Sequence, residues 1–298
     1  MIKNFNELLA KVKKMKNKKV VIAAAHTSSA LEAAILAKKE CIADSLLVGE
    51  KSIILEYFKE NAPKLTDAFE IIDTGSDMSL AAKESVKAIQ EGKADILLKG
   101  KCDTATLLKA VLNKVDGLRT GEILSDVLVY EHPEKLVLMS DGGINLYPTI
   151  EDKVSIIKNA VKVAHGLENP KPCVALLAAV EVVNSKMPPT IDASIIAKMN
   201  ERKQIKGCII DGPLAFDNAV SEMAAKMKGI DSEVAGKADV LIVPNIESGN
   251  IFGKCLTYYC NYRVAHVVMG AKAPILIASR ADTAETKMLS MALGVLSA

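Results

Sequence analysis

The chain has 298 residues, half of them hydrophobic, which is enough for one large domain or two medium ones with substantial cores. Its 38 lysines and arginines nearly balance 36 aspartates and glutamates, and tryptophan is absent. The sequence therefore lacks both the basic field and the base-stacking side chains typical of nucleic-acid-binding proteins. Any anion that the protein binds is expected to be held by a few local groups.

The first element along the chain is an amphipathic helix. Phe5, Leu8, Leu9, Val12 and Met15 fall on one helical face, which favours packing on the protein's own domain over binding to a membrane surface. Residues 1–19 lack the apolar centre of a signal peptide, and no later run approaches the roughly 20 residues of a membrane span. The six cysteines include no CxxC pair, so a reducing, cytoplasmic compartment is predicted, with no membrane partner.

Short apolar runs then alternate with segments of helical periodicity, such as residues 28–40 and 76–92. Most of the runs are continuously apolar, which is typical of strands buried on both faces of a parallel sheet. An α/β fold is therefore predicted, with two lobes of mostly parallel sheet flanked by helices and a boundary near His132 and Pro133. The nine runs are "VVIAAA" (20–25), "SLLVGE" (45–50), "FEIIDTG" (69–75), "ADILLKG" (94–100), "LVLMSDG" (136–142), "CVALLAAV" (173–180), "CIIDGP" (208–213), "ADVLIVPN" (238–245) and "PILIASR" (274–280).

Polar residues follow most of these runs. In parallel α/β sheets, ligands bind beyond the carboxyl ends of the strands, so the chemistry is expected there. The candidates are His26 to Ser29, Lys99 to Lys101, Ser140 to Gly143, Asp211 to Pro213, Asn245 to Lys254, and Ser279 with Arg280.

The last run leads directly into Ser279 and Arg280 and then into a helix. A guanidinium at a strand end offers a planar fork for phosphate or carboxylate, and a neighbouring helix N-terminus adds free N–H groups. A salt bridge between lobes is an equally good role for Arg280. Asp282 and Glu285 have the spacing of a capping box, which favours helix capping over general-base work for both.

Two glycine-containing segments were compared with known phosphate-binding loops. "ESGNIFGKC" (247–255) fails as a nucleotide P-loop, because Gly249 and Gly253 are one residue too close and Cys255 replaces the Mg²⁺-binding hydroxyl. "SDGGINLYPT" (140–149) lacks the third glycine of the dinucleotide fingerprint, so a simple tight turn is as good an interpretation. The four histidines have no metal-ligand spacing, and no Ser-His-Asp arrangement is visible.

Taken jointly, six stretches of the chain resemble the phosphate acetyl/butyryltransferase family, most closely its butyryl branch. They are "ADILLKGKCDTATLLKAVL" (94–112), "GLRTG" (117–121), "LVLMSDGGINLYPTIEDK" (136–153), "IIDGPLAFDNAVS" (209–221), "ADVLIVPNIESGNIFGK" (238–254) and "ASRADTAETKMLSMAL" (278–293). The resemblance implies reversible acyl transfer between coenzyme A and inorganic phosphate. Acyl-CoA is then a substrate, and no permanently bound cofactor or metal is expected.

The resemblance also implies an architecture like that of isocitrate and isopropylmalate dehydrogenases, with the active-site cleft between two lobes. The last helix is expected to cross back, so that residues 1–134 with 284–298 form the first lobe and 135–283 the second. A homodimer or higher homo-oligomer and metabolic coupling to an acyl (butyrate) kinase are expected from the family.

The family's serine-arginine pair corresponds to Ser279 and Arg280 in this sequence. By that resemblance, Arg280 binds phosphate, Ser279 donates to the thioester or thiolate sulfur, and Glu285 is the third candidate catalytic residue. The expected substrate-binding residues are Lys99, Thr104, Arg119, Ser140, Asp141, Gly142, Gly212, Pro213, Ser248, Gly249, Asn250 and Lys254. Ser248 to Asn250 are expected in a strand-to-helix loop on the phosphate side, with Lys254 one turn into the helix.

Two positions depart from the acetyl branch. That branch has an aspartate seven residues after the serine, where this chain has Thr286; Glu285 is one position earlier, and one residue turns a helix by about 100°. Lys109 stands near an arginine of that branch, for which Arg119 is a candidate replacement. The base that deprotonates the thiol in the reverse direction is therefore left open.

Three alternatives to a phosphate butyryltransferase stay open. A phosphate acetyltransferase would differ only in acyl-chain length. A decarboxylating dehydrogenase would need a carboxylate cluster for Mg²⁺ and an arginine group for a hydroxy acid, and the sequence shows neither. A non-catalytic sensor of CoA or acyl phosphate would not require Ser279 and Arg280, which are both present.

Overall fold

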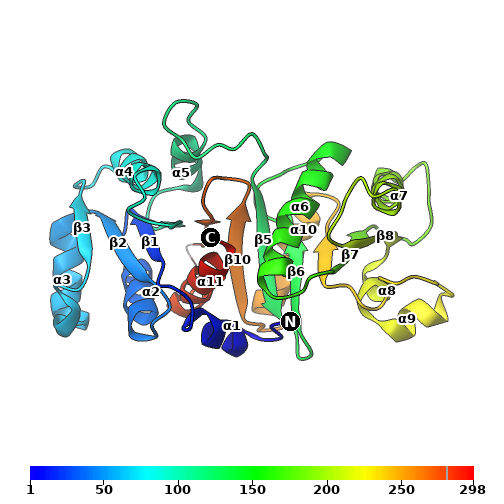
Figure 1. Ribbon diagram of the computed structural model, residues 1–298, viewed down its shortest axis with the longest axis horizontal. Helices are drawn as coiled ribbons and strands as arrows, with labels where there is room; N and C mark the ends of the chain where they lie inside the picture. Colours follow the sequence, from blue (N-terminus) through cyan, green and yellow to red (C-terminus); the bar gives the residue numbers. More distant parts are fainter. Residues whose placement is uncertain (280) are drawn as a thin grey trace. The chain divides into compact units, whose positions relative to one another are not determined.

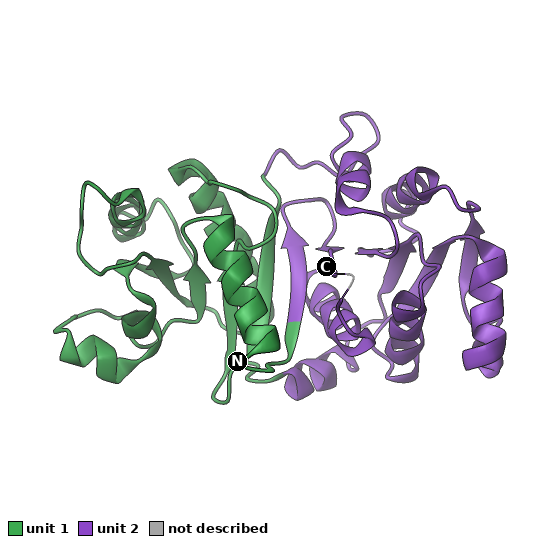
Figure 2. Cartoon of the chain, turned by 180° about the vertical axis from the view of Figure 1, so that it is seen from behind, with its two compact units in different colours: residues 1–4, 123–264 green, residues 5–122, 265–298 purple. Residues whose placement is uncertain are grey.

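Apolar strands and amphipathic helices alternate along the chain in this computed structural model, which describes residues 1–279 and 281–298 (Figure 1). The chain divides into two compact units (Figure 2): residues 1–4 with 123–264, and residues 5–122 with 265–298. The expectation of an α/β fold with mostly parallel sheets flanked by helices is confirmed. The lobe boundaries after residues 134 and 283, the cleft between lobes and the likeness to dehydrogenases stay predictions.

The unit of residues 5–122 and 265–298 is built mainly from βα repeats. Its elements are α1 (Phe5–Val12), β1 (Lys19–Ala23), α2 (Ser28–Lys39), β2 (Asp44–Gly49), α3 (Lys51–Asn61), the 3₁₀ helix η1 (Pro63–Leu65), β3 (Glu70–Asp73), α4 (Met78–Gln90), β4 (Ile96–Lys99), α5 (Thr104–Val111), β10 (Val264–Met269), β11 (Ile275–Leu276) and α11 (Ala284–Ser297).

The strands of this unit lie in the order β3-β2-β1-β4-β11-β10. All neighbours are parallel except β10 and β11. Leu276 of β11 pairs with Leu98 of β4, although the two strands are far apart in sequence. The chain segments that leave β4 and β11 therefore start next to each other.

The C-terminal helix α11 is buried along most of its length. A Cβ atom on Gly294 would lie 3.2 Å from Cγ2 of Ile96 and 3.3 Å from Cδ2 of Leu276, so the absence of a side chain lets α11 approach β4 and β11 closely. This packing fixes the first turn of α11 over the carboxyl ends of the same two strands.

The unit of residues 1–4 and 123–264 repeats the α/β pattern. Its elements are β5 (Ser125–Glu131), β6 (Leu136–Ser140), α6 (Ile150–Gly166), β7 (Cys173–Leu177), α7 (Pro188–Glu201), β8 (Ile209–Leu214), α8 (Phe216–Val220), α9 (Glu222–Met227), β9 (Val240–Ile242) and α10 (Ile246–Tyr258). The strand order is β5-β6-β9-β7-β8, with only β5 antiparallel to its neighbour.

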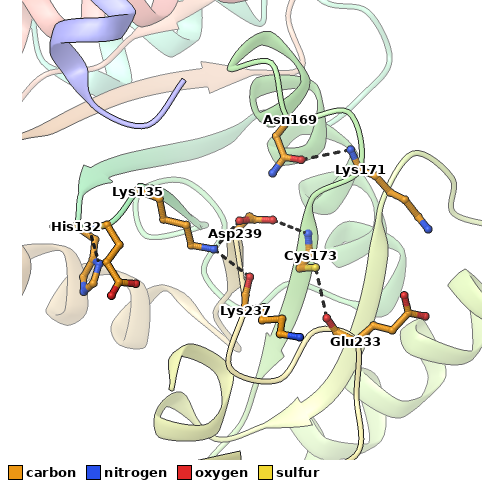
Figure 3. Close-up of polar contacts among 9 residues, drawn as sticks. His132, Lys135, Asn169, Lys171, Cys173, Glu233, Lys237 and Asp239 are labelled. Atoms are coloured by element: carbon orange, nitrogen blue, oxygen red, sulfur yellow. Dashed lines mark hydrogen bonds and ion pairs between the residues drawn. The ribbon is translucent and has the colours of Figure 1, made fainter. Parts of the chain in front are cut away.

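A polar network joins the amino ends of β6, β7 and β9 (Figure 3). The Asp239 carboxylate accepts hydrogen bonds from the Cys173 backbone N–H at 2.9 Å and from the Lys135 ammonium at 2.6 Å, and the same ammonium donates to the Lys237 carbonyl at 3.0 Å. Charge-assisted bonds of this kind fix the register of three parallel strands. These side chains hold the strands together at their amino ends. A ligand site is therefore expected at the carboxyl ends of the strands.

Candidate functional site

Lys99 is the last residue of β4, and its side chain is buried, with 6% exposure. Its ammonium donates to the carbonyl of Cys102 at 3.5 Å. The next residue must be glycine, because a Cβ on Gly100 would lie only 2.4 Å from the carbonyl oxygen of Ala24. The backbone after β4 therefore turns tightly at Gly100, and the Lys99 ammonium contacts the loop that follows at Cys102.

Ser279 lies in the segment between β11 and α11, and its side chain is exposed. Its backbone N–H donates to Oδ2 of Asp282 at 2.7 Å, and its Oγ accepts from the N–H of Ala281 at 3.4 Å. Thr283, not Asp282, caps α11, since its Oγ1 accepts from the N–H of Thr286. The capping-box interpretation of Asp282 and Glu285 is therefore wrong. Asp282 instead stabilises the turn at Ser279 by accepting the Ser279 N–H.

Glu285 and Thr286 both lie in the first turn of α11. The Glu285 side chain is exposed, whereas Thr286 is half-buried and its hydroxyl contacts that of Thr283 at 3.1 Å. Arg280 lies outside the described residues. Its role in phosphate binding and that of Glu285 in catalysis stay predictions.

Lys287, one turn into α11, was not singled out from the sequence. Its side chain is only 4% exposed, and its ammonium donates to the carbonyl of Asp282 at 2.5 Å. Burial lowers the pKa of Lys287; Asp282 opposes this shift and the nearby Lys99 ammonium adds to it. The only sequence signal was a lysine within an otherwise apolar helix face, which is also the pattern of an amphipathic surface helix.

Thr104 and Arg119 belong to the same unit as Ser279. Thr104 is the half-buried first residue of α5, which Asp103 caps. The backbone of Arg119 pairs with that of Ala271 between β10 and β11, and its side chain is exposed. Arg119 is therefore placed where the chain enters β11, whereas Ser279 follows the exit from that strand.

In the other unit, Ser140 is the last residue of β6, Asp141 follows it, and both are buried. The Ser140 hydroxyl donates to the Asp126 carbonyl at 2.7 Å. The Asp141 carboxylate accepts three backbone N–H groups, from Gly143, Ile144 and Asn145. Both side chains are thus engaged in shaping the loop that follows, in which Gly142 is buried and Gly143 is exposed.

The expected strand-to-helix loop at Ser248 to Asn250 is instead the first turns of α10, which begins at Ile246 with Asn245 as its cap. The N–H and hydroxyl of Ser248 both donate to Oδ1 of Asn245, so this N–H is committed to the helix. Asn245 can cap because its short amide reaches back to the first free N–H groups. The expectation that this was a loop is wrong.

The structure brings the start of α10 against the loop after β6. A Cβ on Gly249 would lie 2.7 Å from the Cα of Gly142, and the Asn250 side chain donates to the Gly142 carbonyl at 3.2 Å. Lys254 is exposed one turn further along α10. Gly142 and Gly249 are therefore in buried backbone contact, with the exposed Asn250 beside them, and the role of all three in substrate binding stays a prediction.

Gly212 and Pro213 were expected to follow a strand but lie within β8. A Cβ on Gly212 would lie 2.7 Å from the Cβ of Leu176 on β7, so the glycine permits close strand packing. The sheet order places β7 and β9 between β8 and the Ser140 strand β6. No described contact joins Gly212 or Pro213 to Gly142, Gly249 or Asn250.

The described residues contain no group of three or more histidine, cysteine, aspartate or glutamate side chains placed to hold a metal ion. They also contain no helix with the length and hydropathy needed to cross a membrane.

Comparison with known proteins identifies the family. The model of the family "Phosphate acetyl/butaryl transferase" matches residues 76–295. The chain is 47% identical to a phosphate butyryltransferase of Clostridium acetobutylicum, over 99% of this chain and 98% of that one. It is 44% identical to a phosphate acetyltransferase of Thermotoga maritima, over 97% and 98% of the two chains. A branched-chain phosphotransacylase of Enterococcus faecalis V583 superposes with a TM-score of 0.82 at 31% identity, covering 94% and 98%. The chain belongs to the phosphate acetyl/butyryltransferase family.

Proposed function

We propose that this protein is a phosphate butyryltransferase, which converts butyryl-CoA and phosphate reversibly into butyryl phosphate and CoA. Similarity to phosphate butyryl- and acetyltransferases over nearly the whole chain supports the reaction class. The main structural support is the position of Ser279. It is exposed in the segment after β11, and β11 pairs with β4, which ends in the buried Lys99.

The reaction needs positioning more than acid–base activation. An oxygen of hydrogen phosphate attacks the thioester carbonyl, a C–O bond forms, the C–S bond breaks, and the proton of hydrogen phosphate finally resides on the CoA thiol. Phosphate is already anionic at neutral pH, so holding it in line with the carbonyl supplies the orientation advantage. Thiols have a pKa of roughly 8.5, and a hydroxyl that donates to the developing thiolate helps it leave.

The proposed roles follow this chemistry. Ser279 donates to the sulfur, Arg280 binds phosphate, and the exposed Asn250 beside Gly142 contributes to substrate binding. The buried Asp141 acts by ordering the Gly142 loop rather than by touching substrate. No resident cofactor is proposed; acyl-CoA is the substrate. We also propose that the protein is a cytoplasmic homo-oligomer and that its acyl phosphate product is used by an acyl kinase.

A phosphate acetyltransferase is the second candidate, because the relative from Thermotoga maritima is almost as similar as the butyryl enzyme. The two differ in the acyl chain that fits the site. Initial rates with acetyl-, propionyl-, butyryl- and isobutyryl-CoA at saturating phosphate distinguish them.

The first prediction is phosphate-dependent release of free thiol from butyryl-CoA by the purified protein. A thiol reagent follows the release continuously, and omission of phosphate supplies the blank. Ser279→Ala should lower kcat, because the thiolate loses its donor. If no short acyl-CoA releases thiol in a phosphate-dependent way, the acyltransferase proposal fails and a sensor of CoA or acyl phosphate becomes the better interpretation.

A further inference from the structure

Three helices in the unit of residues 1–4 and 123–264 have an apolar outer surface. Helices α8, α9 and α10 pack on the same hydrophobic core, to which they contribute Ala219, Ala225 and Leu256, respectively. The outward side of a helix that covers a core is ordinarily polar. Here the outward sides carry seven exposed large apolar side chains, which together are called the α8–α10 face: Phe216, Val220, Met223, Met227, Ile251, Tyr258 and Tyr259.

The three helices are neighbours. The Phe216 ring at the start of α8 contacts the Phe252 ring of α10, with 5.0 Å between the ring centroids. Helix α8 leads directly into α9, and the two helices contact each other (Figure 1). On α10, the spacing of Ile251, Tyr258 and Tyr259 places them on one side of the helix. The exposed apolar side chains therefore belong to adjoining parts of one surface.

The size of the α8–α10 face matches that of a stable protein interface. Met223 is 72% exposed, Met227 81% and Tyr259 87%. Taking about 200 Å² for a fully exposed large side chain, the seven side chains expose roughly 800 Å². A stable interface buries about 800 Å² on each partner, whereas the largest apolar patch on a typical monomer is roughly 300–600 Å². The face is therefore large enough to bind another protein chain.

The charged residues on these helices favour a protein partner over a membrane surface. Glu222 and Lys226 are both exposed on α9, and Glu247 and Lys254 are both exposed on α10. A helix that lies in a membrane interface carries mostly lysine and arginine on its polar side. Charges of both signs, together with exposed methionine and aromatic side chains, are typical of a protein interface.

The outer side of α10 is complementary to itself. Glu247, Ile251, Lys254 and Tyr258 recur at helical spacing, so they form one stripe along the helix. The Tyr147 hydroxyl donates to the Glu247 carboxylate, which has further acceptor sites. When two copies of α10 cross antiparallel at Ile251, each Glu247 lies opposite the Lys254 of the other copy. A two-fold axis produces this arrangement, because both copies then use the same surface.

We propose that a second copy of this chain binds to the α8–α10 face, with the two α10 helices antiparallel and crossing near Ile251. The apolar side chains fill the contact, and the pairs of Glu247 with Lys254 of the partner subunit border it. This inference locates the interface of the homo-oligomer and rests on that part of the proposed function. Molecular mass is measured without turnover, so the inference can fail while the acyltransferase activity holds.

The second prediction concerns Ile251→Arg, which places two like charges at the centre of the interface. The dissociation constant of the dimer should rise by roughly one-hundred-fold or more, because a central apolar anchor is lost and an unpaired charge is buried. Sedimentation velocity over a range of protein concentrations measures this constant. Val115→Arg is the matched control, since Val115 is 94% exposed in the other unit; its dissociation constant should stay near that of the wild type.

Charge exchange tests the antiparallel crossing. Glu247→Lys and Lys254→Glu should each weaken the dimer several-fold, because like charges then face each other on both sides of the axis. The double variant Glu247→Lys/Lys254→Glu restores opposite charges and should recover most of the affinity, less so at high salt. Lys254 is also expected to bind substrate, so the readout is molecular mass rather than activity. Circular dichroism checks that each variant is folded.

Three results would overturn the inference. A wild-type protein that is monomeric throughout the concentration range would leave the α8–α10 face to another partner. A folded Ile251→Arg variant with an unchanged dissociation constant would place the interface elsewhere, while the homo-oligomer itself would stand. A double variant that recovers none of the affinity lost by the two single variants would contradict the antiparallel crossing.

Discussion

Asp141 is a buried carboxyl group whose ionisation is unfavourable but whose hydrogen bonds order a loop. It is 3% exposed, and burial together with the neighbouring Asp126 carboxylate raises its pKa from an ordinary 3.8 to about 6. The N–H groups of Gly143 and Ile144 and the Asn145 amide oppose that shift. The carboxylate is therefore expensive to ionise, yet its oxygens order the loop that carries Gly142.

The third prediction follows from the sign of this shift. Between pH 4 and pH 6 the folded state binds the Asp141 proton more tightly than the unfolded state, so this contribution to stability falls as pH rises through that window. A shift of about two units corresponds to roughly 3 kcal/mol. Urea unfolding at several pH values should show that the stability difference, wild type minus Asp141→Asn, declines from pH 4 to pH 7. A difference that is flat or increases with pH would show that Asp141 is not a raised-pKa group.

The close approach of α10 to the loop after β6 depends on a pair of glycines. Gly249 and Gly142 face each other with no room for a Cβ on either. Gly253 lies one turn later on the same helix, where a Cβ would be 3.4 Å from the nearest atom, Cδ2 of Leu128. The two glycines of "ESGNIFGKC" therefore have different roles: the first permits backbone contact, and the second faces ordinary side-chain packing.

The fourth prediction uses this difference within one helix. Gly249→Ala should destabilise the protein by roughly 1–3 kcal/mol, because the backbone of Gly142 has to move. Gly253→Ala should be neutral or stabilising by up to about 1 kcal/mol, since alanine is the better helix former and its methyl group fits. Urea unfolding measures both. Equal effects of the two substitutions would mean that the Gly142–Gly249 contact is not tight in solution.

At the scale of the whole molecule, the two compact units differ in continuity. Residues 123–264 form nearly all of one unit in a single stretch, whereas the other unit needs both 5–122 and 265–298. Without the second stretch, β4 loses its neighbour β11 and the apolar side chains that α11 covers become exposed. Burial of such surface is the main favourable term in folding.

The fifth prediction is that these units behave differently when expressed separately. A fragment of residues 123–264 should fold with a cooperative unfolding transition. A fragment of residues 1–122 should be largely unfolded or aggregated, and it should gain structure when linked to residues 265–298. Circular dichroism and thermal unfolding check both fragments. A stable, cooperative fragment of residues 1–122 would show that α11 and β11 are dispensable for that core.

Much of the fold was predictable because its signals are local. Each of the nine apolar runs contains a strand, because short, mostly apolar runs between turn residues are typical of strands in a parallel sheet. The strands β5 and β10 were not among the nine predicted runs, although turn residues follow both of them. Thr283 rather than Asp282 caps the last helix, since both residue types can cap and sequence spacing alone does not choose between them.

The sequence by itself determined the class of fold, the family and the strand ends at which chemistry was expected. These features depend on apolar patterns and motifs formed by residues that are close together in sequence. Only the tertiary structure decided which strand ends are neighbours, as with Leu98 and Leu276, and which polar side chains are buried. Lys287 is the clearest case. Its burial depends on how α11 packs across β4 and β11, and that contact joins residues too distant in sequence for any local pattern to specify.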